Sequence, residues 1–198
     1  MARASASPTG SRFIRWAMVV LGTCFVVVVV NCLFSRPNPE LNAIARAAEV
    51  YHEIQTTSAG SSSLMPHSRQ PIQFSNSTEY FRALIGRGDT SIRAECFVPM
   101  GLIWWYSTVA ILERDNNLWC IVLDVDATTQ EKTPVMFTKN LAIESLDKAS
   151  ADQVDQTPLL GSRCVLVIRK DGTSDRIEPS DIAKRLNSDG ATNRVLRP

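Results

Sequence analysis

The sequence is poor in the residues that build catalytic and metal sites. His52 and His67 are its only histidines in 198 residues, and no two cysteines have the spacing of a zinc site. Neither a G-x-S-x-G nucleophile motif nor a phosphate-binding Walker loop occurs. No local signature joins serine, histidine and aspartate. The sequence therefore predicts a protein that is not an enzyme and that carries no cofactor and no metal.

Charged residues are absent from one long stretch near the start of the chain. Between Trp16 and Ser35 there is no Asp, Glu, Lys, Arg or His. About 20 apolar residues in a helix, at ~1.5 Å each, cross the ~30 Å hydrocarbon core of a bilayer. We therefore predict a transmembrane helix over residues 16–35. Its expected anchor residues are Trp16, Val20, Phe25, Val28, Leu33 and Phe34.

Acidic residues are also missing ahead of this stretch, and their absence sets its expected orientation. Arg3, Arg12 and Arg15 precede the span, so the positive-inside rule places the N-terminus in the cytoplasm and the bulk of the chain outside. Residues 1–15 are expected to form a disordered cytoplasmic N-terminus. No small-residue cleavage site of the A-x-A type follows the apolar stretch, which favours an uncleaved anchor over a secretory signal peptide.

The part of the chain after the span has no excess of basic residues. Of the 21 Lys and Arg residues three precede residue 36, whereas all 20 acidic residues follow it. This near-neutral balance lacks the positive charge that nucleic-acid binding requires. We expect no nucleic-acid partner, and the membrane contact is assigned to the N-terminal helix alone.

Cysteines are few, and an odd number lies outside the span. Cys96, Cys120 and Cys164 allow at most one internal disulfide. Cys120 and Cys164 lie in strand-like runs, so two interpretations remain open. They are buried free thiols, or they form a bridge between neighbouring strands.

Hydrophobic periodicity predicts an α+β protein with about four antiparallel strands packed against helices. Residues 36–73 are expected to form a membrane-proximal helix and a loop, and residues 74–198 a globular domain. The expected helix over 40–55 has an apolar stripe of Ile44, Ala47, Ala48, Tyr51 and Ile54. In the globular domain we expect a first helix over 76–86. The expected strands are 118–125, 134–141, 164–169 and 175–177, with a hairpin turn at 170–172. A last helix is expected to be capped by Ser180, with Ile182, Ala183 and Leu186 facing inward.

Two further segments allow more than one interpretation. Residues 96–112 are uncharged and contain Trp104, Trp105 and Tyr106, which predicts either core strands or an exposed apolar patch for a partner. Acidic residues gather near the end of the strand over 118–125, where a solvated loop and a calcium site are the alternatives. These acidic residues are Asp124, Asp126 and Glu131.

The globular domain contains four short motifs: Asn76-Ser77-Thr78-Glu79-Tyr80-Phe81, Asn116-Asn117-x-Trp119-Cys120-x-Val122, Thr133-Pro134-Val135-x-Phe137-Thr138-x-Asn140-Leu141, and Val165-x-Val167-x-Arg169-Lys170-x-Gly172. In this order and at plausible spacing, they resemble a group of bacterial pseudopilin-like proteins of the type IV pilin and type II secretion class. The resemblance covers roughly residues 74–178.

The resemblance implies a hydrophobic N-terminal helix that is both membrane anchor and packing spine, with a sheet laid against its outer half. Such proteins are structural and assemble helix to helix. The implied partners are other pilin-like subunits, further copies of the chain, or inner-membrane proteins of a secretion or pilus machine. The implied location is the bacterial inner membrane, in a single pass, with the C-terminal domain in the periplasm or outside the cell.

The start of the chain departs from the prepilin pattern. Ser11 follows Gly10, and Arg15 stands where a prepilin has the Glu that pairs with a neighbour's freed amine. Because a cation repels that amine, we expect no processing by prepilin peptidase.

The sequence thus leads to two main hypotheses of function. The first is a structural subunit or accessory component of a type II secretion or type IV pilus-like membrane machine. The alternative is a membrane-tethered envelope module that holds a protein partner through the patch of Trp104, Trp105 and Tyr106. An anchored enzyme would require an acid–base pair that converges only in the folded chain.

Overall fold

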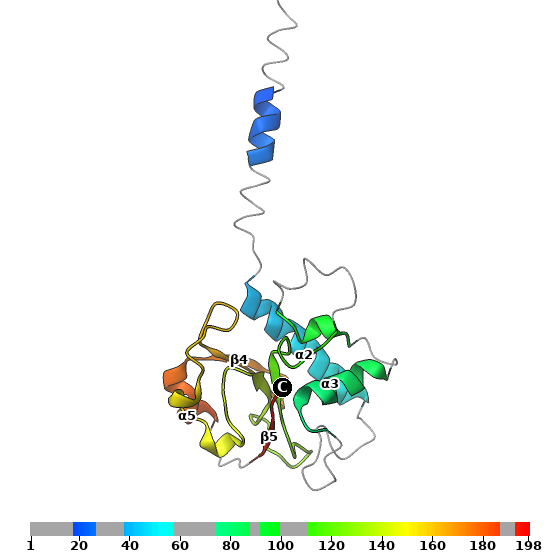
Figure 1. The fold of residues 1–198 in the computed structure, drawn as a ribbon, viewed down its shortest axis with the longest axis vertical. Helices are drawn as coiled ribbons and strands as arrows, with labels where there is room; N and C mark the ends of the chain where they lie inside the picture. Colours follow the sequence, from blue (N-terminus) through cyan, green and yellow to red (C-terminus); the bar gives the residue numbers. More distant parts are fainter. Residues whose placement is uncertain (1–17, 27–37, 58–73, 88–91, 100–110, 187–192) are drawn as a thin grey trace, which may run out of the picture. The chain divides into compact units, whose positions relative to one another are not determined.

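The computed structural model describes residues 18–26, 38–57, 74–87, 92–99, 111–186 and 193–198. The chain divides into two compact units, Met1–Asn38 and Pro39–Pro198. The second unit contains the sheet and the helices that pack on it (Figure 1).

The described part of the first unit is a helix of residues 18–26. Val20 and Phe25 on this helix are 56% and 70% exposed. Among the described residues no helix is both long enough and apolar enough to cross a membrane. The predicted span over residues 16–35 continues outside the described residues at both ends. Four of the expected anchor residues lie there: Trp16, Val28, Leu33 and Phe34.

The second unit is built on one antiparallel sheet in the order β4-β3-β2-β1-β5. The α+β class predicted from the sequence is therefore confirmed. The expected number of about four strands was wrong, because a C-terminal segment adds a fifth strand beside β1. The strands are β1 Trp119–Val122, β2 Pro134–Thr138, β3 Val165–Arg169, β4 Ser174–Ile177 and β5 Val195–Leu196.

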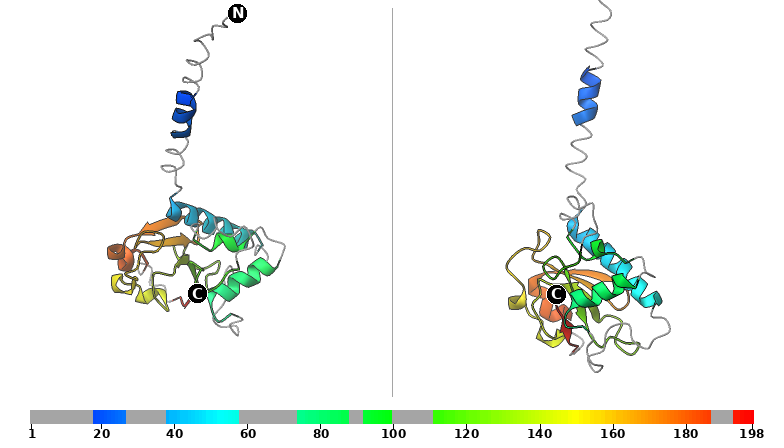
Figure 2. Two further views of the ribbon diagram at one scale, coloured as in Figure 1. Left: turned by 45° about the horizontal axis from the view of Figure 1, so that its top comes forward. Right: turned by 45° about the vertical axis from the view of Figure 1, so that its right-hand side comes forward.

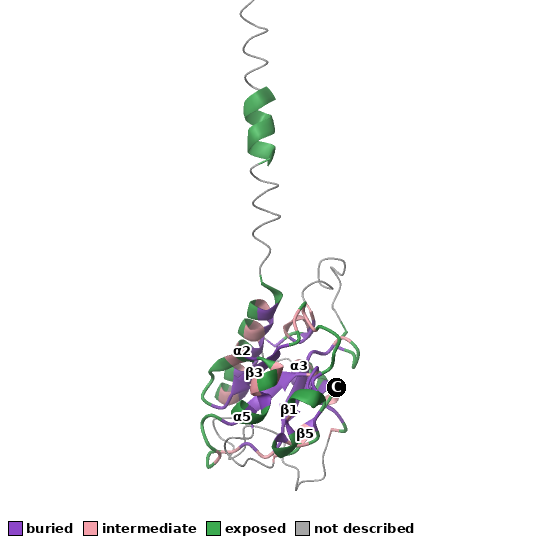
Figure 3. Cartoon of the chain, turned by 90° about the vertical axis from the view of Figure 1, so that its left-hand side faces the viewer, coloured by how far each residue is buried: buried purple, intermediate pink, exposed green. Residues whose placement is uncertain are grey.

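The three central strands are buried on both faces. Every residue of β1, β2 and β3 is buried, whereas β4 at one edge is exposed except at Ile177 and the half-buried Asp175. Continuous apolar runs, rather than alternating ones, are typical of strands covered on both sides. In Figure 3 the buried colour accordingly runs through β1 and β3 and along the inner side of α2.

Helix α2, Pro39–Thr57, lies against the sheet at β3 in both views of Figure 2. It belongs to the same compact unit as the sheet, although the sequence pattern assigned it to a membrane-proximal segment. Its buried apolar face consists of Ala43, Ala47, Val50, Tyr51 and Ile54. This face overlaps the predicted stripe, but Ile44 and Ala48 are only half-buried, because the stripe is rotated slightly around the helix.

Helix α3, Ser77–Gly86, begins at the cap that the sequence predicts. Asn76 Oδ1 accepts a 2.9 Å hydrogen bond from the backbone N–H of Glu79, and the Glu79 carboxylate accepts a 2.8 Å bond from the N–H of Ser75. Two backbone donors at the start of the helix are satisfied in this way.

The C-terminal helix α5, Ile182–Leu186, corrects two details of the expectation. Ile182 and Leu186 are buried, but Ala183 is exposed, because a five-residue helix presents only a narrow strip to the core. Ser180 lies within the 3₁₀ turn η4, Pro179–Asp181, which directly precedes α5. Three further 3₁₀ turns lie among the described residues: η1 Ala94–Cys96, η2 Leu146–Lys148 and η3 Ala151–Gln153.

The cysteines of the second unit are free thiols, and the sheet explains why. Cys120 on β1 lies opposite Phe137 on β2, and Phe137 lies opposite Val167 on β3, three residues from Cys164. Strand β2 thus separates the two cysteines by about two strand spacings, ~9.5 Å, which exceeds the ~7 Å Cα separation that a disulfide tolerates. The bridge between neighbouring strands that we considered does not form.

Candidate functional site

Several polar residues of the motifs are buried and hydrogen-bonded to backbone groups. Asn117 is fully buried between α3 and β1. Its amide nitrogen donates 3.1 Å bonds to the hydroxyls of Ser77 and Thr78, and its oxygen accepts a 2.9 Å bond from the N–H of Trp119. Ser77 in turn donates a 2.8 Å bond to the carbonyl of Trp119. The first two motifs therefore join helix α3 to the first strand.

A second pair of polar motif residues connects β2 to β3. Thr138 Oγ1 accepts a 3.0 Å bond from the N–H of Leu166, and Asn140 Nδ2 donates a 3.0 Å bond to the carbonyl of Cys164. Both side chains are buried, at 0% and 4% exposure. They satisfy backbone groups where the two strands diverge, so their role is structural.

Lys170 is a buried cation at the β3–β4 hairpin. Its ammonium donates to the carbonyls of Thr129 and Ala127, at 2.5 and 3.1 Å, and lies 3.1 Å from the Glu131 carboxylate. The carbonyl of Lys170 accepts a 2.8 Å bond from the hydroxyl of Tyr51 on α2. With 5% exposure, this lysine joins the loop after β1, the hairpin and α2. Gly172 closes the hairpin with φ +79, a conformation that favours glycine.

The acidic loop after β1 is a turn folded around Asp126. Asp126 Oδ1 accepts bonds from the hydroxyls and backbone N–H groups of Thr128 and Thr129. The Thr128 side chain contributes most to lowering the pKa of Asp126 to about 2. Glu131 pairs with Lys170. Within the described ranges no group of three or more His, Cys, Asp or Glu residues is placed to hold a metal ion.

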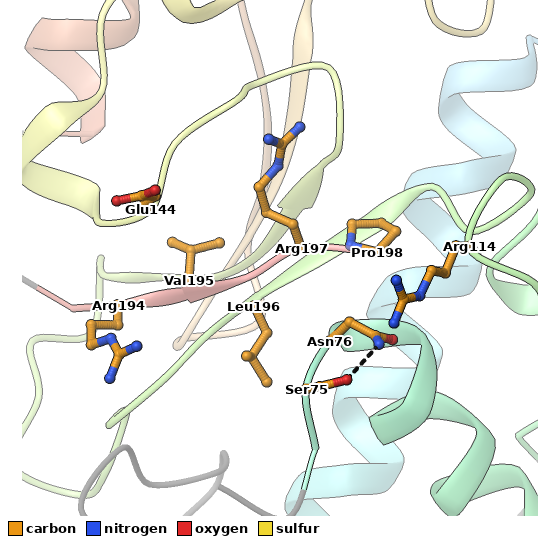
Figure 4. Close-up of a pocket in the computed structure, with 9 residues that line it drawn as sticks. All are labelled: Ser75, Asn76, Arg114, Glu144, Arg194, Val195, Leu196, Arg197 and Pro198. Atoms are coloured by element: carbon orange, nitrogen blue, oxygen red, sulfur yellow. Dashed lines mark hydrogen bonds between the residues drawn. The ribbon is translucent and has the colours of Figure 1, made fainter.

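A groove of about 560 Å³ lies beside strand β5 (Figure 4). The backbone of residues 194–198 runs along it, with Arg194 and Leu196 on one side of the strand and Val195 and Arg197 on the other. The groove is lined by Ser75, Asn76, Arg114, Glu144, Arg194, Val195, Leu196, Arg197 and Pro198. Three of these residues are arginines, so positive charge predominates in the lining.

Three segments that are distant in the sequence fix the wall of this groove. β5 pairs with β1, with Ile121 opposite Leu196. On its other side, the N–H of Val195 donates a 2.8 Å bond to the carbonyl of Glu144, and the carbonyl of Arg197 accepts a 2.9 Å bond from the N–H of Ser77. Backbone hydrogen bonds on both sides thus hold the arginines on a rigid strand.

Two of the site residues predicted from the sequence lie among the described residues, and the others lie outside them. Val20 and Phe25 lie on the helix of residues 18–26. Trp104, Trp105 and Tyr106, the predicted partner patch, lie outside the described residues. Sequence reasoning missed the groove, because its arginines come from a turn before β1 and from the C-terminal segment, and none stands in a motif.

The second unit thus defines an α+β head in which a long helix is fastened across an antiparallel sheet. A scan against protein-family models and searches of curated proteins and of solved structures found no match to the chain.

Proposed function

We propose that the chain is a pilin-like structural subunit, or an accessory component, of a type II secretion or type IV pilus-like membrane machine, assembling through its N-terminal helix. The observation that carries the proposal is the attachment of α2 to the sheet. At one end, Arg176 Nε of β4 lies 2.9 Å from Glu40 Oε2 in the first turn of α2. Toward the other end, Tyr51 and Gln55 donate to the carbonyl of Lys170, at 2.8 and 3.1 Å.

This attachment makes α2 an integral packing element of the head. A helix that is hydrogen-bonded to the sheet near both of its ends is held in a fixed position on it. That property supports a structural subunit whose anchor sets the place of its head.

The use of the polar motif residues also supports a structural role. Asn117, Thr138, Asn140 and Lys170 direct their donors or acceptors to backbone groups of the same chain. A catalytic residue needs a donor, acceptor or nucleophile directed toward a substrate. In this proposal the motifs therefore specify how the head folds, and assembly is left to the apolar N-terminal segment.

Site-specific photo-crosslinking in native membranes tests the proposal. A benzophenone amino acid at Phe25 of the full-length chain is expected to give protein adducts with a second copy or with other pilin-like chains, identified by mass spectrometry. The same probe at His52, an exposed position of α2, is the matched control. Adducts with lipid alone at Phe25, together with a monomeric chain under mild crosslinking, would contradict the proposal.

A further inference from the structure

Helix α2 is exposed to solvent along one side, opposite the face that packs on the sheet. After its first residue, Pro39, the exposed positions follow one another at intervals of three or four residues, so they form a single line along the helix. In chain order these positions are Leu41, Ala45, Glu49, His52 and Thr56. The line is apolar over its first two positions and polar from the third position onward.

Leu41 is the centre of a small apolar patch at the start of α2. It is 64% exposed, and Ala45 lies one turn further along the same side of the helix. Ile44 and Ala48 flank these two residues, half-buried and packed against the core. A single exposed leucine is common on protein surfaces. This one is distinguished by its neighbours and by its position in the chain.

The apolar patch follows closely after the predicted membrane span. The uncharged stretch ends at Ser35, and Leu41 is the sixth residue after it. Six residues reach about 20 Å when fully extended and about 9 Å in a helix. In the proposed topology Leu41 therefore lies within about 20 Å of the end of the span. The polar end of the line, at Thr56, lies a further ~22 Å along the helix.

The size of the patch favours lipid over a protein as its partner. A specific protein–protein interface buries about 800 Å² on each partner, which far exceeds the surface of one leucine and one alanine. Insertion at the boundary between lipid headgroups and acyl chains is stabilised in proportion to the buried apolar area, so a small patch contributes. A membrane anchor also keeps the head at a high effective concentration near the lipid, where a weak contact is sufficient.

We propose that the first two turns of α2 contact the bilayer surface, with Leu41 and Ala45 inserted at the boundary between headgroups and acyl chains. Glu49, the first charged position of the exposed line, marks where the helix leaves this boundary. The inference rests on the anchoring of the chain through its N-terminal helix, which belongs to the proposed function. It goes beyond that function, because a contact on one side of α2 sets the orientation of the head relative to the membrane.

Photo-crosslinking of the full-length chain in vesicles of phosphatidylethanolamine and phosphatidylglycerol tests this contact. A benzophenone amino acid at Leu41 is expected to give lipid adducts in at least about tenfold higher yield than the same probe at His52, further along the exposed line. With the probe at Ala45, Leu41→Gln is expected to lower the yield of lipid adducts severalfold. His52→Gln is the matched control and is expected to leave that yield unchanged.

The outcomes separate this inference from the proposed function. Flotation of the vesicles after an alkaline wash verifies that the chain is anchored. An anchored chain with equal lipid adducts at Leu41 and His52 would overturn the inference alone, and so would protein adducts at Leu41 in place of lipid adducts. Adducts with lipid alone at Phe25, together with lipid adducts at Leu41, would contradict only the assembly through the N-terminal helix. A chain that does not float with the vesicles would overturn both.

Discussion

The hydroxyl of Tyr51 donates a 2.8 Å hydrogen bond to the backbone carbonyl of Lys170, across 119 positions of sequence. Both residues are buried, at 1% and 5% exposure. The bond joins helix α2 to the hairpin between β3 and β4, the point where the helix is most firmly attached to the sheet. The strength of this attachment is open to direct measurement.

Replacing Tyr51 by Phe is expected to lower the free energy of unfolding by about 1 kcal/mol, the net worth of a buried hydrogen bond. The loss stays modest because Gln55 continues to donate to the same carbonyl. Urea unfolding of the full-length chain, followed by tryptophan fluorescence, measures it. His52→Gln, at an exposed position of the same helix, is expected to change nothing. Equal stability of the two variants would show that the Tyr51 bond does not fasten the helix.

Asn117→Ala is expected to lower the free energy of unfolding by about 2–3 kcal/mol. The substitution leaves the buried N–H of Trp119 without its acceptor and removes the hydrogen bonds between α3 and the start of β1. Asn116→Ala is the neighbouring control. Its side chain bonds the turn at Glu113 and Ile111 in partly exposed surroundings, so a loss below about 1 kcal/mol is expected. The same urea titration compares the two, and a larger loss for Asn116 would refute the assignment of Asn117 as the tie between these elements.

Alkaline pH is expected to destabilise the head. Burial raises the pKa of Cys120 from 9.0 to about 12, and that of Tyr51 and of Tyr80 from 10.0 to about 12. These groups lose their protons more readily in the unfolded chain than in the folded one. Their contribution to the free energy of unfolding is therefore complete below pH 9 and is lost as pH rises toward 12. Each group lowers the free energy of unfolding by at most about 1.4 kcal/mol per pH unit.

Urea unfolding of the full-length chain at pH 8, 9, 10 and 11 measures this decline. Cys120→Ala is expected to show a shallower decline between pH 9 and 10 than the unmodified chain, because only the tyrosines then contribute. A free energy of unfolding that stays constant from pH 8 to 11 would show that these groups are not buried as described.

Much of the head could be predicted from local pattern. Strands β1, β2 and β3 are apolar runs with turn residues at their ends, and α3 begins with an Asn cap and a Glu three residues later, so short-range rules suffice. The α+β class and the antiparallel pairing of β1 with β2 followed from these short-range rules.

Elements fixed by distant contacts were not predicted. Val195–Leu196 is too short to show any period, and it becomes a strand only because β1 offers it an edge. The groove was missed for a related reason, since Arg114, Arg194 and Arg197 line one groove only after β5 has paired. The burial of Asn117 was not predicted either, because it depends on α3 packing over this residue.

The bond between Tyr51 and Lys170 also governs the order of events during synthesis. At about 5–20 residues per second, the ribosome adds the 119 positions that separate them in roughly 6–24 s. For all of that time the apolar face of α2 has no sheet to cover it. The nascent chain therefore passes through an interval in which this apolar face is uncovered, and any delay in completing the hairpin lengthens that interval.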